Sequence, residues 1–199
     1  KIQTIPTSTA SSEFAPGQFE IKLNSTANLL KAADDSILLR RRVKETAIKH
    51  GYEATFLSKP YLNEAGSGMH LHLSLYDKNK KNVFSKNKLK NKYLLHAIVG
   101  LQTTMYECMA IFAPHLHSSR RFLPVQFVPV HSSWGPNHTS WTFSIPVSNN
   151  KPTSIDMTVS GSASKASLVY SSILILYISF IFKSAIESSL TISCTFFLG

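Results

Sequence analysis

The segment Met69-His70-Leu71-His72-Leu73-Ser74-Leu75-Tyr76 alternates between apolar and polar side chains along its whole length. Successive side chains of a β-strand point to opposite faces of a sheet, so a period of two residues is typical of a strand with one buried face. The pattern predicts a strand that presents His70, His72 and Ser74 on one face. The leucines on the other face are expected to pack behind it.

Two carboxylates stand close together in the sequence Glu13-Phe-Ala-Pro-Gly-Gln-Phe-Glu20, and His70 follows the glycine-flanked stretch Gly66-Ser-Gly. Carboxylate oxygens are the ligands that Mg²⁺ and Mn²⁺ prefer, and imidazole suits the softer Mn²⁺. Together these residues resemble most of a divalent-metal site. Taken singly, the alternatives are a solvated hairpin for Glu13 and Glu20 and a structural role for His70.

Periodicity and breaker residues predict the other elements. Phe19–Leu23 alternates, which predicts a strand with Glu20 on the face away from the core. A helix is expected to start at Asp34 and Asp35 and to end at His50 and Gly51. The remaining expectations are a loop over residues 1–12, a short strand over 54–57, a long helix over 93–112, and loop and strand over 114–146.

Residues 168–182 form an apolar run, LVYSSILILYISFIF, which is shorter than the roughly 20 residues needed to span a bilayer. A core helix is the interpretation favoured here. A membrane segment and a tail unrelated to the rest of the chain are the alternatives.

The net charge of +10 raises the question of an anionic partner. Seven lysines crowd residues 78–92 without arginine and with few aromatic side chains, which is typical of a solvated loop and helix start. No nucleic-acid-binding motif accompanies them, so nucleic acid is not expected as a partner. Cys108 and Cys194 have no metal-ligand spacing and fit a reducing compartment, the cytoplasm.

Three segments resemble the catalytic domain of the glutamine synthetase family in order and spacing: EFAPGQFEI, KAADDSILLRRRVKETAIKHGYEATFLSKPY and NEAGSGMHLHLSL. The motifs PGQFE and GSGMHLH are specific as a pair. The resemblance continues more weakly to about residue 168. It predicts a partial catalytic domain over residues 1–167 and an apolar tail, truncated or non-homologous, over residues 168–199.

The resemblance implies an α+β fold in which helices back a curved antiparallel sheet, here incomplete. It also implies Mg²⁺ or Mn²⁺ and ATP as cofactors. The implied metal ligands are Glu13, Glu20, His70 and Asp156, where the family has glutamate in place of Asp156. The implied nucleotide-side residues are His72, Ser74 and Lys151.

Arg121 resembles the arginine with which the family holds the substrate carboxylate, and a surface ion pair beside Arg120 is the alternative for it. Other arginines of the family are replaced, by His138, Ser144, Ser154 and Thr158. An arginine that contacts a transferring phosphoryl group accelerates the reaction by about 10³–10⁵. Losing several predicts an inactive protein.

The favoured hypothesis is therefore a catalytically inactive protein with a structural or chaperone-like role, as in a member of the family from the vertebrate lens. That resemblance implies a homo-oligomeric ring and intermediate filament proteins as partners. The alternative is an active ATP-dependent ligase that joins glutamate to ammonia or another amine. A role in the membrane is the weakest interpretation.

Overall fold

The computed structural model describes residues 5–85, 90–122, 133–136, 143–146, 154–160 and 187–199. Strands from these ranges form one sheet in the order β1-β2-β8-β4-β7-β6-β5, and β3 pairs with β8 beside this path. All pairs are antiparallel except β5 with β6. The strands are β1 (Thr7–Ser12), β2 (Gln18–Leu23), β3 (Ala54–Thr55), β4 (Gly68–Tyr76), β5 (Trp134–Pro136), β6 (Phe143–Ile145), β7 (Ile155–Ser160) and β8 (Glu187–Leu198).

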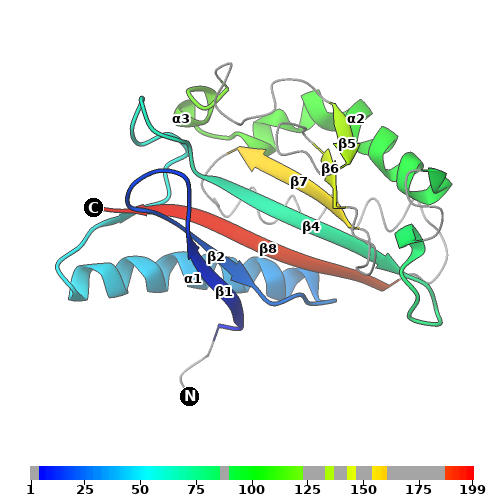
Figure 1. The fold of residues 1–199 in the computed structure, drawn as a ribbon, viewed down its shortest axis with the longest axis horizontal. Coiled ribbons are helices and arrows are strands. Elements are labelled where there is room, and N and C mark those ends of the chain that lie inside the picture. The colour runs from blue at the N-terminus through cyan, green and yellow to red at the C-terminus, as the bar shows by residue number, and fades with distance from the viewer. Residues whose placement is uncertain (1–4, 86–89, 123–132, 137–142, 147–153, 161–186) are drawn as a thin grey trace.

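The last strand in the sequence occupies the middle of the sheet. β8 runs between β2 and β4 and is antiparallel to both (Figure 1). Its Ser193 pairs with Lys22 on one side and with His70 on the other. The strands that bear the two sequence motifs are thus neighbours of β8 and not of each other.

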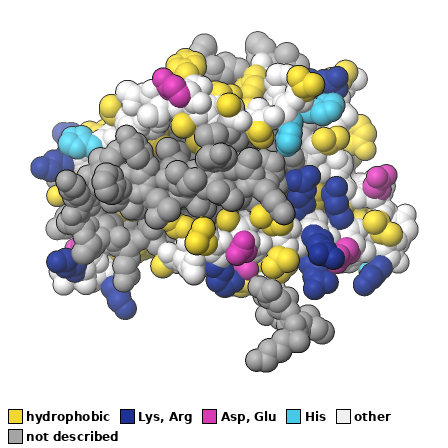
Figure 2. Space-filling model, turned by 180° about the vertical axis from the view of Figure 1, so that it is seen from behind, with side chains coloured by type: hydrophobic (Ala, Val, Ile, Leu, Met, Phe, Trp, Pro, Cys, Tyr) yellow, Lys and Arg dark blue, Asp and Glu magenta, His cyan; other side chains and the backbone are white. Residues whose placement is uncertain are grey.

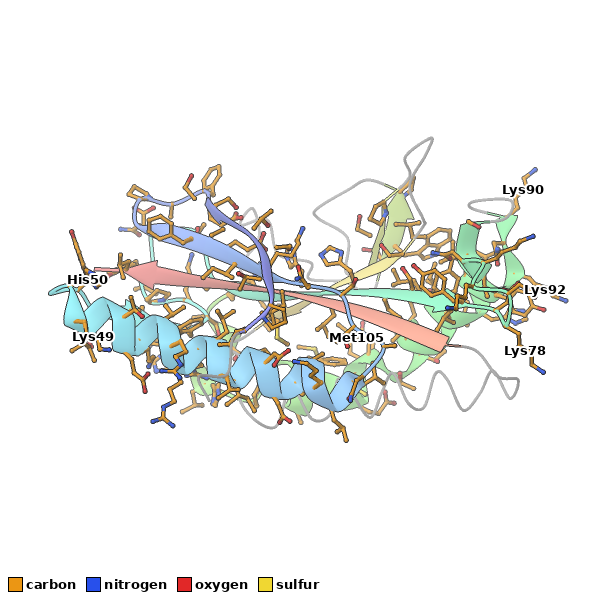
Figure 3. The ribbon with its side chains drawn as sticks, turned by 90° about the horizontal axis from the view of Figure 1, so that it is seen from below. Lys49, His50, Lys78, Lys90, Lys92 and Met105 are labelled. Carbon is orange, nitrogen blue, oxygen red and sulfur yellow. The ribbon has the colours of Figure 1, made fainter. Side chains whose placement is uncertain are left out.

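The two long helices, α1 (Leu29–Lys49) and α2 (Lys92–Phe112), lie on the same side of the sheet (Figure 3). The core lies between them and the leucines of β4, since Leu71, Leu73 and Leu75 are all buried. The strand expected over residues 69–76 is confirmed with its predicted faces, and the predicted α+β fold is confirmed with it. His70, His72 and Ser74 are only partly buried and lie on the face that neither long helix covers.

Helix α1 begins earlier than the sequence analysis predicts. The side chain of Asn28 accepts a hydrogen bond from the backbone N–H of Lys31 and thereby caps the first turn. Asp35, which was expected as a cap, is instead a buried residue in the second turn of the helix. The ammonium group of Lys31 donates a hydrogen bond to its carboxylate at 2.5 Å. The predicted end is confirmed, because Gly51 follows His50 with φ of +79°, a left-handed conformation that favours glycine.

Other boundaries also differ from expectation. Residues 7–12, predicted as loop, form strand β1, because the backbone of these polar residues pairs with β2. The short strand expected over residues 54–57 is reduced to Ala54–Thr55. The helix expected over 93–112 is confirmed as α2. Further along lie a short helix, α3 (Leu116–Ser119), and the brief strands β5 and β6.

Lysine and arginine side chains lie toward both ends of the face turned away from the viewer in Figure 1, together with acidic ones (Figure 2). Lys78, Lys90 and Lys92 lie together at the end of the molecule opposite Lys49 and His50 (Figure 3), and all three are exposed. The apolar run over 168–182 lies outside the described residues. In the part of the chain that is described, no helix is both long and apolar enough to cross a membrane.

Candidate functional site

The β1–β2 hairpin positions the first motif, and Gln18 joins it to the second. The Gln18 side chain is 3% exposed. Its amide oxygen accepts from the backbone N–H of Ala15 at 3.1 Å, and its amide nitrogen donates to the carbonyl of Gly66 at 3.2 Å. These two hydrogen bonds, the first buried and the second partly buried, hold the turn of the hairpin against the glycine-rich loop, 48 residues further along the chain.

Gly17 fixes the same turn against the end of β8. Its φ is +71°, and a Cβ atom at this position would lie 2.8 Å from the carbonyl oxygen of Leu198. The backbone N–H of Leu198 in turn donates to the carbonyl of Gly17 at 2.8 Å. Only glycine satisfies both the conformation and the close approach, so the PGQFE motif is shaped by its contact with β8.

Glu13 and Glu20 lie close to the turn of this hairpin, and the charge of Glu13 acts on Glu20. Burial raises the pKa of the Glu13 carboxyl above its ordinary value. The pKa of Glu20 is raised by burial first and by repulsion from Glu13 second, while Lys22 acts in the opposite direction. Glu13 forms no ion pair within the described residues, nor does Glu20. The pair is thus an excess of negative charge in partly desolvated surroundings.

His70 and His72 lie two residues apart on β4, with their ring centroids 6.3 Å apart and the rings nearly perpendicular. Burial lowers the pKa of His70 to about 4, with further contributions from Arg121, His72 and Lys22. Burial and Lys22 lower the pKa of His72 to about 4 as well. Both rings are therefore neutral at pH 7, which is the state in which imidazole binds a metal or accepts a hydrogen bond.

Arg121 is packed directly beneath the glycine-rich loop and is 5% exposed. A Cβ atom at Gly66 would lie 2.9 Å from its Cγ, and one at Gly68 would lie 2.9 Å from its Cζ. The glycines of the GSG motif thus leave the space that the arginine fills. Arg121 therefore does not lie on the surface, where the alternative interpretation placed it. Burial lowers its pKa to about 10, so the guanidinium keeps its charge at pH 7.

A second buried cation accompanies Arg121. Lys59 is 1% exposed, and its ammonium group donates to the carbonyl of Glu64. Burial and then Arg121 lower its pKa. The hydroxyls of Ser58 and Ser118 lie 3.4 Å apart and tie this loop to α3, the element that precedes Arg121. The region behind His70 is therefore positively charged and densely packed.

For the remaining predicted residues the structure gives the strand pairing or nothing. Asp156 lies on β7 opposite His72, and Thr158 lies opposite His70. Ser144 of β6 is the register partner of Asp156, and Thr158 follows Asp156 by two residues on β7. Two positions at which the family has arginine are therefore close to Asp156 in the sheet. Lys151 and His138 lie outside the described residues.

The donor set fits one divalent cation better than two. A cation would balance the charges of Glu13, which is exposed, and Glu20, which is partly buried, and oxygen ligands are the ones Mg²⁺ and Mn²⁺ take. Within the described residues, however, no three histidine, cysteine or acidic side chains converge on one point. His70 is surrounded by cationic side chains instead. Glu13 and Glu20 thus fit the metal, and the half of the site at His70 does not.

Two residues of the site, Gln18 and Lys22, were not predicted from the sequence. Gln18 stands inside the PGQFE motif, but its role as a buried link needs the loop at Gly66. Lys22 lies two residues after Glu20, so the strand period alone could have placed it on the same face. Its influence on both histidines depends on β8, which no sequence signal connects to them.

Comparison with known proteins addresses the family directly. A family model described as "Glutamine synthetase, catalytic domain" matches residues 1–179. The chain belongs to the glutamine synthetase family. The expected resemblance is confirmed at this level, and the match reaches beyond residue 167. The division of the chain at that residue stays a prediction.

Curated relatives of this glutamine synthetase-family chain include enzymes with different amine substrates in their names. It is 38% identical over 174 residues to gamma-glutamylputrescine synthetase PuuA of Escherichia coli, covering 87% of this chain and 37% of the relative. Glutamate–isopropylamine ligase of a Pseudomonas species is 35% identical over 127 residues, which is 62% of this chain and 28% of the relative. Glutamine synthetase of Methanocaldococcus jannaschii is 31% identical over 147 residues, covering 72% and 32%.

A solved structure supports the fold. The chain superposes on glutamine synthetase of Plasmodium falciparum with a TM-score of 0.79 and 22% identity, covering 90% of this chain and 35% of the other. The chain spans about a third of the length of these relatives. The comparisons support the family and do not single out its lens member.

Proposed function

We propose that this chain is part of an ATP-dependent ligase that joins the side-chain carboxylate of glutamate to an amine. The curated relatives named above support this proposal, since their names include ligases for putrescine and isopropylamine as well as glutamine synthetases. The observation that carries it is the hydrogen bond from the side chain of Gln18, a buried residue, to the carbonyl of Gly66. It supports the proposal because it joins the hairpin that bears Glu13 and Glu20 to the glycine-rich loop that precedes His70 and packs against Arg121.

The reaction activates a carboxylate by transfer of a phosphoryl group, and the amine then displaces phosphate and loses a proton. Its barrier is mostly electrostatic, because negative charge spreads over the transferring group. A divalent cation held by Glu13 and Glu20 would neutralise part of this charge. Arg121 keeps its charge while buried and is suited to orient a carboxylate beside the glycine-rich loop.

His70 and His72 act as neutral groups in this proposal. A neutral imidazole offers one N–H donor and one acceptor lone pair, so each ring can hold a polar group of the nucleotide or the substrate without adding charge. Ser74 continues the same polar face of β4. The resemblance assigns His72, Ser74 and Lys151 to the nucleotide side.

A second candidate function is a non-catalytic, structural or chaperone-like role such as the family resemblance to the lens protein lengsin implies. The replacement of arginines by Ser144, Ser154 and Thr158 favours it. Association with intermediate filaments belongs to this candidate alone. For either function we propose a homo-oligomeric ring in the cytoplasm, as the family resemblance implies.

One assay separates the two candidates. The protein is incubated with ATP, Mn²⁺ and glutamate, and phosphate release is measured with ammonia, isopropylamine or putrescine. A ligase gives phosphate release that depends on both glutamate and amine and is lost in Glu20→Gln. The matched control is Glu45→Gln, which changes an exposed pair with Arg41 on α1. Equal background rates in all three proteins would reject the ligase and leave the structural role.

A further inference from the structure

Lys22 is a half-buried cation on the polar face of the sheet. On β2, Phe19 and Ile21 pack against the core cluster and Leu23 is buried within it. The alternate residues, Glu20 and Lys22, therefore point to the opposite face. That is the face on which β4 presents His70 and His72.

β8 brings Lys22 and His70 into one row across the sheet. Ser193 of β8 is the register partner of Lys22 in β2 and of His70 in β4. Because neighbouring strands lie about 4.8 Å apart, the Cα atoms of Lys22 and His70 are separated by roughly 9.5 Å. The four-carbon stem of a lysine on the same face can bring its ammonium group close to the imidazole.

The electrostatics of the site agree with this placement. Lys22 is among the causes that lower the pKa values of His70 and His72, after burial in each case. It also counteracts the raised pKa of Glu20. Its ammonium group forms no ion pair within the described part of the chain. A single cation thus acts on Glu20 and on both histidines.

We propose that the ammonium group of Lys22 occupies the position of a divalent cation on the histidine side of the site. The chain then holds one divalent cation, at Glu13 and Glu20, and supplies the second cation from its own sequence. This inference rests on the proposed function, because it describes how the same site is charged. A second divalent cation at His70 would meet the charges of Lys22 and Arg121, and like charges repel strongly in partly buried surroundings.

The proposal has a consequence for the dependence on metal. A resident ammonium group is present at every metal concentration, whereas a bound divalent ion is lost on dilution. Charge neutralisation on the histidine side is therefore constant. Occupancy by Mn²⁺ should follow a single-site curve.

The test is the number of Mn²⁺ ions bound per chain, counted by electron paramagnetic resonance of free Mn²⁺ during titration. The wild-type chain should bind one. Lys22→Met keeps the length of the side chain and removes its charge, and it should bind two. The double variant Lys22→Met/His70→Ala should return to one. Lys22→Arg, which keeps the charge, and Lys44→Met, an exposed change on α1, should each bind one like the wild type.

The proposal would be overturned if the wild type bound two Mn²⁺ ions or if Lys22→Met bound only one. It would also be overturned if neither the wild type nor Lys22→Met bound any Mn²⁺. If Lys22→Met fails to fold by circular dichroism, the wild type and Glu20→Gln decide alone, with one and no ions expected. The phosphate-release assay is independent of this count. Turnover with two bound ions keeps the ligase and rejects Lys22 as the second cation, whereas no turnover with the expected counts does the reverse.

Discussion

The carboxylates of the β1–β2 hairpin and the histidines of β4 lie on one sheet in surroundings of opposite charge. Glu13 and Glu20 repel each other, and burial raises the pKa of both. Burial lowers the pKa of His70 and His72, and Lys22 and Arg121 add to this effect at His70. Lys22 offsets the charge of Glu20 only in part, whereas cations outnumber anions around His70. This contrast is the basis of our proposal that the two halves of the site differ in their need for a metal.

The largest expected effect comes from disturbing the cationic region through Gly68. In Gly68→Ala the new Cβ would lie 2.7 Å from Nη2 of Arg121, so the buried guanidinium must move. We expect a loss of about 3 kcal/mol in the free energy of unfolding, measured by urea denaturation. Gly100→Ala on α2 is the control, because nothing lies within 4 Å of its added Cβ. That change should stabilise the helix by up to about 1 kcal/mol. Equal stability of the two variants would contradict the packing of Arg121 beneath the loop.

A second change isolates the carboxylate region. Glu20→Gln removes a partly buried charge that Glu13 repels, so the metal-free protein should become more stable at pH 7. It should also lose the stabilisation by Mn²⁺, which is about 2.7 kcal/mol when Mn²⁺ exceeds its Kd a hundredfold. Thermal melting with and without Mn²⁺ measures both effects. Glu45→Gln should keep the full response to Mn²⁺. A Glu20→Gln protein that still responds to Mn²⁺ would show that the metal binds elsewhere.

The two regions should respond to pH in opposite directions. His70 and His72 have pKa values of about 4 in the folded chain and about 6.5 when unfolded, so the unfolded chain binds protons first. Their contribution to the free energy of unfolding is complete above about pH 6.5 and is lost as the pH falls towards 4. For Glu13 and Glu20, whose pKa values are raised, the contribution is present at low pH and is lost as the pH rises through the folded pKa values.

This contrast is measured by urea denaturation between pH 4 and pH 7. In His70→Gln the free energy of unfolding should fall by about 2 kcal/mol less between pH 7 and pH 4 than it does in the wild type. The full pKa shift would give a larger difference, but the ring is partly exposed. His96→Gln, at an exposed position of α2, serves as the control. An unchanged pH profile in His70→Gln would mean that this ring is not kept neutral by its surroundings.

The smallest expected effect lies outside both regions. Asn28→Ala removes the side-chain cap of α1 and should lower the free energy of unfolding by about 1 kcal/mol. Mn²⁺ binding should not change, because the cap lies on the helix that covers the opposite face. A changed Mn²⁺ affinity in this variant would show that α1 is coupled to the site and would weaken the comparison between the two regions.

Local patterns predicted much of the fold. The alternation of residues 69–76 was sufficient for β4 and its two faces, because a strand that is buried on one side must repeat every two residues. The period of the second long helix was equally clear. The start of α1 was missed because Asp34 and Asp35 look like caps, whereas Asn28 performs that role and Asp35 pairs with Lys31. Strand β1 was missed because its polar residues give no apolar period.

The candidate site was predicted in part. The two motifs pointed to Glu13, Glu20, His70 and His72, since metal and phosphate chemistry require these residue types, and the family resemblance added Arg121. The roles of Asp156 as a metal ligand and of Lys151 on the nucleotide side stay predictions, as does the core helix over residues 168–182.

The sequence by itself determined the periodic elements, the family and the donor atoms, because each depends on residues close together in the chain. Only the tertiary structure decided that β8 separates the two motif strands and sets Lys22 in one row with His70. It also decided that Arg121 is buried beneath Gly66 and Gly68. Strand order and register are set by backbone pairing between distant segments, and a charge acts on its neighbours in space. Neither can be derived from the spacing of residues along the chain.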